Sequence, residues 1–205
     1  LCLTLQQATA QEFKFPQNLT YPYGHMPSTF STENFEKWYS RYKASNLLPS
    51  CNGGIAVNTD NGVKVEAMGW AMIIAAYMGD KSTFDGLYKF YKSKIQSHGM
   101  MAWLCSCGGI SDAGSASDGD LDVAFSLLVA TWQWGDEYRE EAAKTIKTVK
   151  KLITSCSGTS VIVGGYSGNN PYGGCDQTDI SYYTPAFFRE IAKFTGDSAW
   201  SKLAD

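Results

Sequence analysis

The sequence is short of positive charge, of histidine and of long hydrophobic runs, and each shortage argues against a class of protein. Lys and Arg number 17 against 20 Asp and Glu, and no basic run stands out, which argues against nucleic acid and anionic membrane surfaces as partners. No apolar stretch approaches the roughly 20 residues that a membrane-spanning helix needs. We therefore expect a protein that binds neither nucleic acid nor membranes.

The scarcity of histidine bears on metal binding. His25 and His98 are the only two histidines, and neither stands at a spacing typical of metal ligands. One residue separates Cys105 from Cys107, whereas paired cysteines in zinc sites usually have two residues between them. The acidic run at 118–122 lacks the glutamate that would complete a calcium loop of the EF-hand type. The sequence thus predicts neither a metal site nor a cofactor.

Hydrophobic and aromatic residues are abundant by contrast. Hydrophobic residues make up 44% of the 205 residues and charged residues 18%, which is typical of one folded domain with its own core rather than of a disordered chain. Aromatic residues reach 14%. That supply serves a core, and it also serves the flat ring faces that line sugar-binding clefts.

The N-terminus resembles the end of an export signal. A short apolar stretch is followed by Ala8-Thr9-Ala10, which has the small-x-small pattern found before a cleavage point. We expect residues 1–10 to be a signal peptide remnant and the protein to be secreted, with a ragged terminus as the alternative. Export would permit one or two disulfides, whose pairing the sequence does not reveal. The cysteines that remain beyond the signal are Cys51, Cys105, Cys107, Cys156 and Cys175.

Helical periodicity recurs along the chain. Two of the segments are apolar on nearly every face, at 66–78 and 120–134, whereas the segment at 137–155 is amphipathic and more polar. A further helix begins near Ser198, and a short strand is predicted at 161–163. The full set of predicted helices is 33–48, 66–78, 83–95, 120–134, 137–155 and 184–194.

Three of these helices end at the same dipeptide, Gly-Asp, beginning at Gly79, Gly135 and Gly196. Glycine takes the left-handed conformation that ends a helix, and aspartate caps the next one. The repeat predicts successive αα-hairpins and an all-α helical toroid, with apolar helices inside and polar helices outside. The glycine-rich stretches at 104–119 and 156–181 would then lie at one mouth of the toroid.

Two predicted helix starts carry carboxylates. Glu66 begins an apolar helix, where partial desolvation raises a carboxyl pKa and suits a general acid, although favouring the helix dipole is the simpler explanation. Asp118, Asp120 and Asp122 alternate at a loop-to-helix junction, which predicts Asp118 as the N-cap and the others in the first turn. A cap needs one aspartate and three repel one another, so a functional role is the alternative.

The segment at 116–134, ASDGDLDVAFSLLVATWQW, resembles the signature of glycoside hydrolase family 8. That signature runs Ala, Ser or Thr, Asp, Ala or Gly, Asp, then a helix that closes on an aromatic residue; Val123 replaces its Ile or Met. Five other segments resemble family segments in the same order. They are Tyr21-Pro22-Tyr23-Gly24, the stretch 65–72 around Glu66, Met101-Ala102-Trp103, and the stretches 172–174 and 181–186.

The resemblance implies that residues 11–205 are the N-terminal part of an (α/α)6 catalytic toroid, incomplete in this chain. It also implies inverting hydrolysis, in which one carboxylic acid protonates the leaving oxygen and one carboxylate activates water on the opposite face. By resemblance, Glu66 is the acid and Asp118 lies beside the sugar at the cleavage point. The residues that would bind substrate are Trp103, Tyr172 and Tyr182.

The resemblance has departures. Many members carry the catalytic base in a Tyr-Asp-Ala-x-Arg segment, which this sequence lacks, so we expect the natural protein to continue beyond Asp205. Val65, Ala67 and Ala71 replace a serine and two glycines around the acid. We predict a secreted, monomeric endo-β-1,4-glucanase of the cellulase type. The alternatives are action on chitosan, xylan or mixed-linkage β-glucan, and a non-catalytic glycan-binding toroid.

Overall fold

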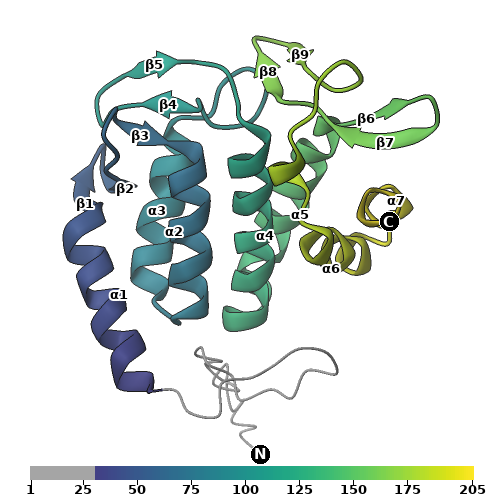
Figure 1. Cartoon of the computed structure of the whole chain (residues 1–205). Helices are drawn as coiled ribbons and strands as arrows, with labels where there is room; N and C mark the ends of the chain where they lie inside the picture. The colour runs from purple at the N-terminus through teal and green to yellow at the C-terminus, as the bar shows by residue number, and fades with distance from the viewer. Residues whose placement is uncertain (1–30) are drawn as a thin grey trace, which may run out of the picture.

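The computed structural model describes residues 31–205, so the expected signal remnant at 1–10 and the segment at 21–24 lie outside the described residues. Helices dominate this part of the chain (Figure 1). The α-helices are α1 (Thr32–Asn46), α2 (Val65–Tyr77), α3 (Lys81–Ser93), α4 (Ser117–Trp134), α5 (Arg139–Val149), α6 (Pro185–Thr195) and α7 (Ser198–Ala204). The 3-10 turns are η1 (Asp136–Tyr138), η2 (Lys150–Leu152) and η3 (Ile180–Tyr182).

The predicted helices are confirmed with small shifts at their ends, and one needs correction. The segment at 137–155 was expected to be a single helix, but α5 ends at Val149 and the chain becomes extended at Ile153. The β-branched pair Ile153 and Thr154 favours a strand over a helix, and this strand pairs with the one predicted at 161–163.

The chain is mostly helical, but it is not all-α as expected, because it also contains short antiparallel strands. β3, β4 and β5 form a three-stranded sheet, and the remaining strands form two-stranded hairpins. Figure 1 shows β1–β5, β8 and β9 gathered at the end of the helices where α2 and α4 begin. The strands are β1 (Leu47–Cys51), β2 (Gly54–Val57), β3 (Val63–Lys64), β4 (Leu104–Cys105), β5 (Ile110–Asp112), β6 (Ile153–Cys156), β7 (Thr159–Ile162), β8 (Gly165–Ser167) and β9 (Asn170–Tyr172).

Helices α2 and α4, which were predicted to lie inside, are largely buried and pack directly on each other. A Cβ atom added at Gly69 would lie 2.6 Å from the Cβ of Asp122, and one added at Gly119 would lie 2.6 Å from the backbone nitrogen of Glu66. Only glycine permits so close an approach. Although α2 and α4 are apolar, no helix within residues 31–205 is both long and hydrophobic enough to span a membrane. Closure into an (α/α)6 toroid stays a prediction.

The predicted Gly-Asp turns occur in two of the three places. Gly79 and Gly196 have φ angles of +67° and +69°. The aspartates that follow, Asp80 and Asp197, accept hydrogen bonds from backbone amides in the first turns of α3 and α7. After Gly135, whose φ is +83°, the chain enters η1 without a side-chain cap.

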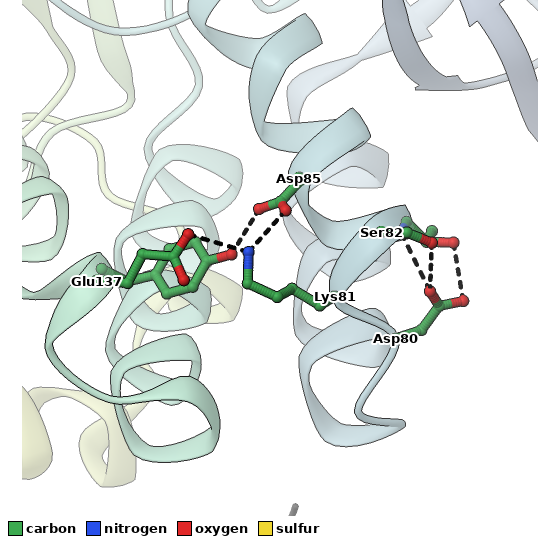
Figure 2. Close-up of polar contacts among 7 residues, drawn as sticks. Asp80, Lys81, Ser82, Asp85 and Glu137 are labelled. Atoms are coloured by element: carbon green, nitrogen blue, oxygen red, sulfur yellow. Dashed lines mark hydrogen bonds and ion pairs between the residues drawn. The ribbon is translucent and has the colours of Figure 1, made fainter. Parts of the chain in front are cut away.

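A polar cluster ties α3 to η1 at the opposite end of the helices from most of the strands. Figure 2 shows the Lys81 ammonium between the carboxylates of Asp85, at 2.9 Å, and Glu137, at 3.0 Å. The Tyr138 hydroxyl donates a hydrogen bond to Asp85 at 2.5 Å. Because these groups are partly exposed, each ion pair contributes about 1 kcal/mol or less to stability.

The structure settles the cysteine pairing that the sequence left open. Cys51 pairs with Cys107, which joins β1 to the loop between β4 and β5. Cys156 pairs with Cys175, which joins β6 to the segment that follows β9. Cys105 is a buried free thiol, and burial raises its pKa and suppresses the reactive thiolate.

Candidate active site

Two candidate catalytic carboxyls project from neighbouring helix starts. Glu66 lies in the first turn of α2, and Asp118 lies in the first turn of α4. The contact at Gly119 brings the first turn of α4 against the backbone of Val65 and Glu66. The helical register and the glycine contact therefore fix Glu66 and Asp118 beside each other.

Asp118 is not the N-cap of α4, contrary to the expectation. The helix begins earlier, with Ala116 at the N-cap position and without a side-chain cap. Ser117 fixes this earlier start, because its amide donates to the carbonyl of Gly164 at 3.1 Å and its hydroxyl to the carbonyl of Val163 at 2.6 Å. The Asp118 side chain lies inside the first turn instead, where its Oδ1 accepts a hydrogen bond from the amide of Gly119 at 2.9 Å.

The electrostatics favour a protonated Glu66. Burial raises the pKa of its carboxyl, and the charge of Asp118 raises it further, against a lowering by a backbone hydrogen bond. Its Oε2 atom is buried and has no hydrogen-bond partner among the described residues. Burial also raises the pKa of Asp118. A carboxyl with a raised pKa is suited to protonating a leaving group.

A pocket of about 700 Å³ opens beside Asp118. Asp122, one helical turn further along α4, shares this pocket with Asp118. Burial and then the charge of Asp118 raise the pKa of Asp122 to about 7. Half of the remaining lining residues are aromatic: Trp38, Tyr42, Trp70, Tyr182 and Phe187.

Tyr172 lies across the start of α4. Its hydroxyl donates a hydrogen bond to the carbonyl of Ser115 at 2.9 Å. A Cβ atom added at Gly164 would come within 2.6 Å of the Tyr172 ring, so the ring lies flush against the backbone there. The side chain remains 47% exposed, which leaves ring surface open to a ligand.

Trp103 lies at the start of α2. Its amide donates to the carbonyl of Gly114 at 2.7 Å, and its carbonyl accepts from the amide of Val65 at 3.0 Å. The indole is partly buried against the hydrophobic core. The backbone of Trp103 therefore bonds to Val65, the residue before Glu66. The indole ring is partly buried and partly exposed.

The predicted site residues thus converge at one end of α2 and α4. Tyr182 shares the pocket with Asp118, and the charges of Asp118 and Glu66 raise the pKa of Tyr172 and Tyr182, although burial is the larger cause for both. Trp103 joins the site through Val65.

Sequence reasoning gave no site role to Asp122 or Trp70. Asp122 lines the pocket, as does Trp70, which is 63% exposed. Each lies four residues after a predicted site residue, Asp118 or Glu66, and residues four apart share a helix face. That spacing was the available signal. Within residues 31–205, no three His, Cys, Asp or Glu side chains are placed to hold a metal ion.

A pair of carboxyl groups at the cleavage point is the usual catalytic arrangement of glycoside hydrolases. The chain belongs to glycosyl hydrolases family 8, whose sequence profile matches residues 14–205. It is 32% identical to Endoglucanase 2 of Ruminiclostridium josui, over 97% of this chain and 46% of that protein. It is 31% identical to a beta-glucanase of Niallia circulans, over 93% of this chain and 51% of that protein.

Solved structures agree with this family assignment. A beta-1,3-1,4-glucanase from Paenibacillus sp. X4 superposes with a TM-score of 0.79 at 27% identity, over 94% of this chain and 56% of that one. A family 8 endoglucanase from Klebsiella pneumoniae superposes with a TM-score of 0.70 at 28% identity, over 82% of this chain and 56% of that one. The chain spans about half the length of the curated relatives it matches.

Proposed function

We propose that this chain is the N-terminal part of a secreted endo-β-1,4-glucanase that acts with inversion and uses Glu66 as its general acid. The observation that carries the proposal is the Glu66 carboxyl. It lies in the first turn of α2 next to Asp118, has a raised pKa, and has a buried oxygen without a hydrogen-bond partner among residues 31–205. Endoglucanases among the relatives support the substrate class.

The other site residues have distinct proposed roles. Asp118 holds the distorted sugar at the cleavage point, while Trp103, Tyr172 and Tyr182 bind neighbouring sugars through their rings. We propose that the base that activates water lies in a part of the natural protein outside this chain. The two disulfides support secretion, since structural disulfides persist mainly in oxidising compartments.

Mixed-linkage β-glucan is the second candidate substrate. It is supported by the similarity to the Paenibacillus beta-1,3-1,4-glucanase and to the Niallia circulans beta-glucanase. Initial rates on carboxymethylcellulose, barley β-glucan, xylan and chitosan decide between the candidates. A preference for carboxymethylcellulose supports the endo-β-1,4-glucanase, and a preference for barley β-glucan supports the alternative.

Glu66→Gln in the full-length natural protein tests the mechanism. Gln cannot donate the proton, so we expect kcat to fall by about 10³-fold, in the middle of the range of acid–base contributions. The variant should still bind glucan, so its migration should still be retarded in gels that contain β-glucan. Glu140→Gln, an exposed change on α5, is the matched control and should retain full activity.

Wild-type turnover by the Glu66→Gln variant would refute the assignment of the acid. A wild-type protein that is retarded in the gel yet releases no reducing sugar would instead identify a non-catalytic glycan-binding protein.

A further inference from the structure

Asp120 is a buried titratable residue that the proposed chemistry does not use. It lies on α4 two residues after Asp118, and its exposed fraction is 0%. A buried carboxyl is costly unless it is neutral or paired, because it loses its contacts with water. A position that served packing alone would be filled by an apolar side chain of similar volume, so the retention of Asp120 calls for a role.

The contacts of Asp120 join α4 to two other elements. The hydroxyl of Tyr91, on α3, donates a long hydrogen bond of 3.5 Å to Oδ1. The backbone of Met101, in the segment that leads into β4, also bonds to the carboxyl. The Oδ2 atom is buried and has no partner among the described residues. Leaving such an atom unpaired costs about 1–3 kcal/mol of stability.

The segment that begins at Met101 leads directly to Glu66. The amide of Ala102 donates to the carbonyl of Lys94 at 3.0 Å, and the carbonyl of Trp103 accepts from the amide of Val65 at 3.0 Å. Val65 is the first residue of α2 and precedes Glu66. A continuous path of backbone bonds therefore runs from Asp120 through residues 101–103 to the helix start that carries the candidate acid.

We propose that Asp120 is a positioning residue: its carboxyl anchors the segment 101–103 and, through Val65, fixes the orientation of Glu66. This inference rests on the proposed function of Glu66. It also gives Asp120 a role distinct from that of Asp118, which faces the pocket.

Burial and nearby charges shift the pKa of the Asp120 carboxyl. Burial, and then the charge of Asp118, raises its pKa well above the ordinary value, and the charge of Glu66 acts in the same direction. Tyr91, on α3, is itself buried and has a raised pKa. The cation that interacts with Asp120 is Lys151, on η2, whose ammonium also donates to the carbonyl of His98.

Two substitutions in the full-length natural protein test this role through the pH profile of kcat. Asp120→Asn is neutral and keeps an acceptor for Tyr91 and Met101, so kcat should stay within about threefold of wild type, with an unmoved alkaline limb. Asp120→Ala should lower kcat by 10-fold to 100-fold with little change in KM. Its alkaline limb should move to lower pH, since water entering the cavity lowers the pKa of Glu66.

The controls separate positioning from stability. Ser126→Ala removes a buried hydroxyl of α4 that donates to the carbonyl of Val123 in the same helix. This variant should leave the pH profile unchanged. If Asp120→Ala does not fold, Tyr91→Phe takes its place, because it removes the hydroxyl that bonds to Asp120, and kcat should fall by about threefold or more.

Several outcomes would overturn the inference. It fails if Asp120→Ala, or Tyr91→Phe in its place, keeps the wild-type kcat and pH profile, and it also fails if Asp120→Asn is as inactive as Asp120→Ala. An active Glu66→Gln variant would overturn the proposed function itself. An inactive Glu66→Gln variant beside a wild-type-like Asp120→Ala variant would overturn this inference alone.

Discussion

The helix starts that carry the candidate carboxyls and the loops that carry the candidate aromatic rings are held by different forces. Glu66 and Asp118 are fixed by the glycine contact between α2 and α4, deep in the core. Tyr172 and Tyr182 lie between Gly164 and Thr184, a stretch with little regular structure that is mostly exposed.

In that exposed stretch, hydrogen bonds and a disulfide hold the chain in place, since few of its side chains are buried. The Thr178 hydroxyl donates to the carbonyl of Ile162 at 2.8 Å, and the amide of Ile162 donates to the hydroxyl of Tyr183 at 3.0 Å. The Cys156–Cys175 disulfide adds a covalent link. The comparison teaches that changes at the helix starts should affect chemistry and global stability, whereas changes in the loop should affect substrate binding.

The largest effect is expected at Asp118, on the helix side of the comparison. Asp118→Asn should lower kcat by about 100-fold or more, since a charge or hydrogen bond at the reacting sugar is lost. The melting temperature should change little, because Asn keeps an acceptor for the amide of Gly119 and the raised pKa of Asp118 marks a charge that burial disfavours. Steady-state kinetics and thermal unfolding check both parts. A fall in melting temperature with unchanged kcat would restore the capping interpretation.

Gly119→Ala should produce the next largest effect, this time on stability. The new Cβ would lie 2.6 Å from the backbone nitrogen of Glu66 and 2.7 Å from the backbone carbon of Val65, so two helices must move apart. We expect the free energy of unfolding to fall by about 2–3 kcal/mol, the upper range for overpacking. Urea unfolding measures it. Gly108→Ala, which meets nothing within 4 Å, should change stability by less than about 0.5 kcal/mol.

Removing the loop disulfide should separate binding from chemistry. In the Cys156→Ser/Cys175→Ser double variant, KM for glucan should rise several-fold while kcat stays within about twofold, because the helix starts are untouched. Stability should fall by at most about 3 kcal/mol, the chain-entropy value for a loop of this size. The Cys51→Ser/Cys107→Ser variant serves as the comparison, because it removes the disulfide between β1 and the loop that joins β4 to β5. A fall in kcat with constant KM in the first variant would contradict the division of roles.

The smallest effect is expected at Asp122, where solvent screens a partly exposed carboxyl. Its pKa is raised from 3.8 to about 7, so the folded protein holds a proton that the unfolded chain has already released. The contribution of Asp122 to stability is therefore lost as the pH rises from about 4 to about 7. Asp122→Asn should flatten the decline of stability across that window. Urea unfolding at several pH values measures the slope, and an unchanged slope would contradict the shift.

The sequence predicted the helix side of this comparison far better than the loop side. Helical periodicity and the signature around Asp118 placed α2, α4 and the two carboxyls, because these depend on residues close in the chain. The start of α4 was misplaced since Ser117 bonds to Val163 and Gly164, which are distant in sequence. Strands of two to five residues and the pairing of cysteines depend likewise on tertiary approach, which local patterns do not encode.

The Cys156–Cys175 disulfide affects how the protein responds to proteolysis. Most residues between the two cysteines are exposed, so they are the natural place for a protease to cut. A single cut there leaves the two fragments covalently joined, and each keeps its own anchorage to the helices. A nicked molecule would therefore migrate as one chain on a gel until a reductant is added.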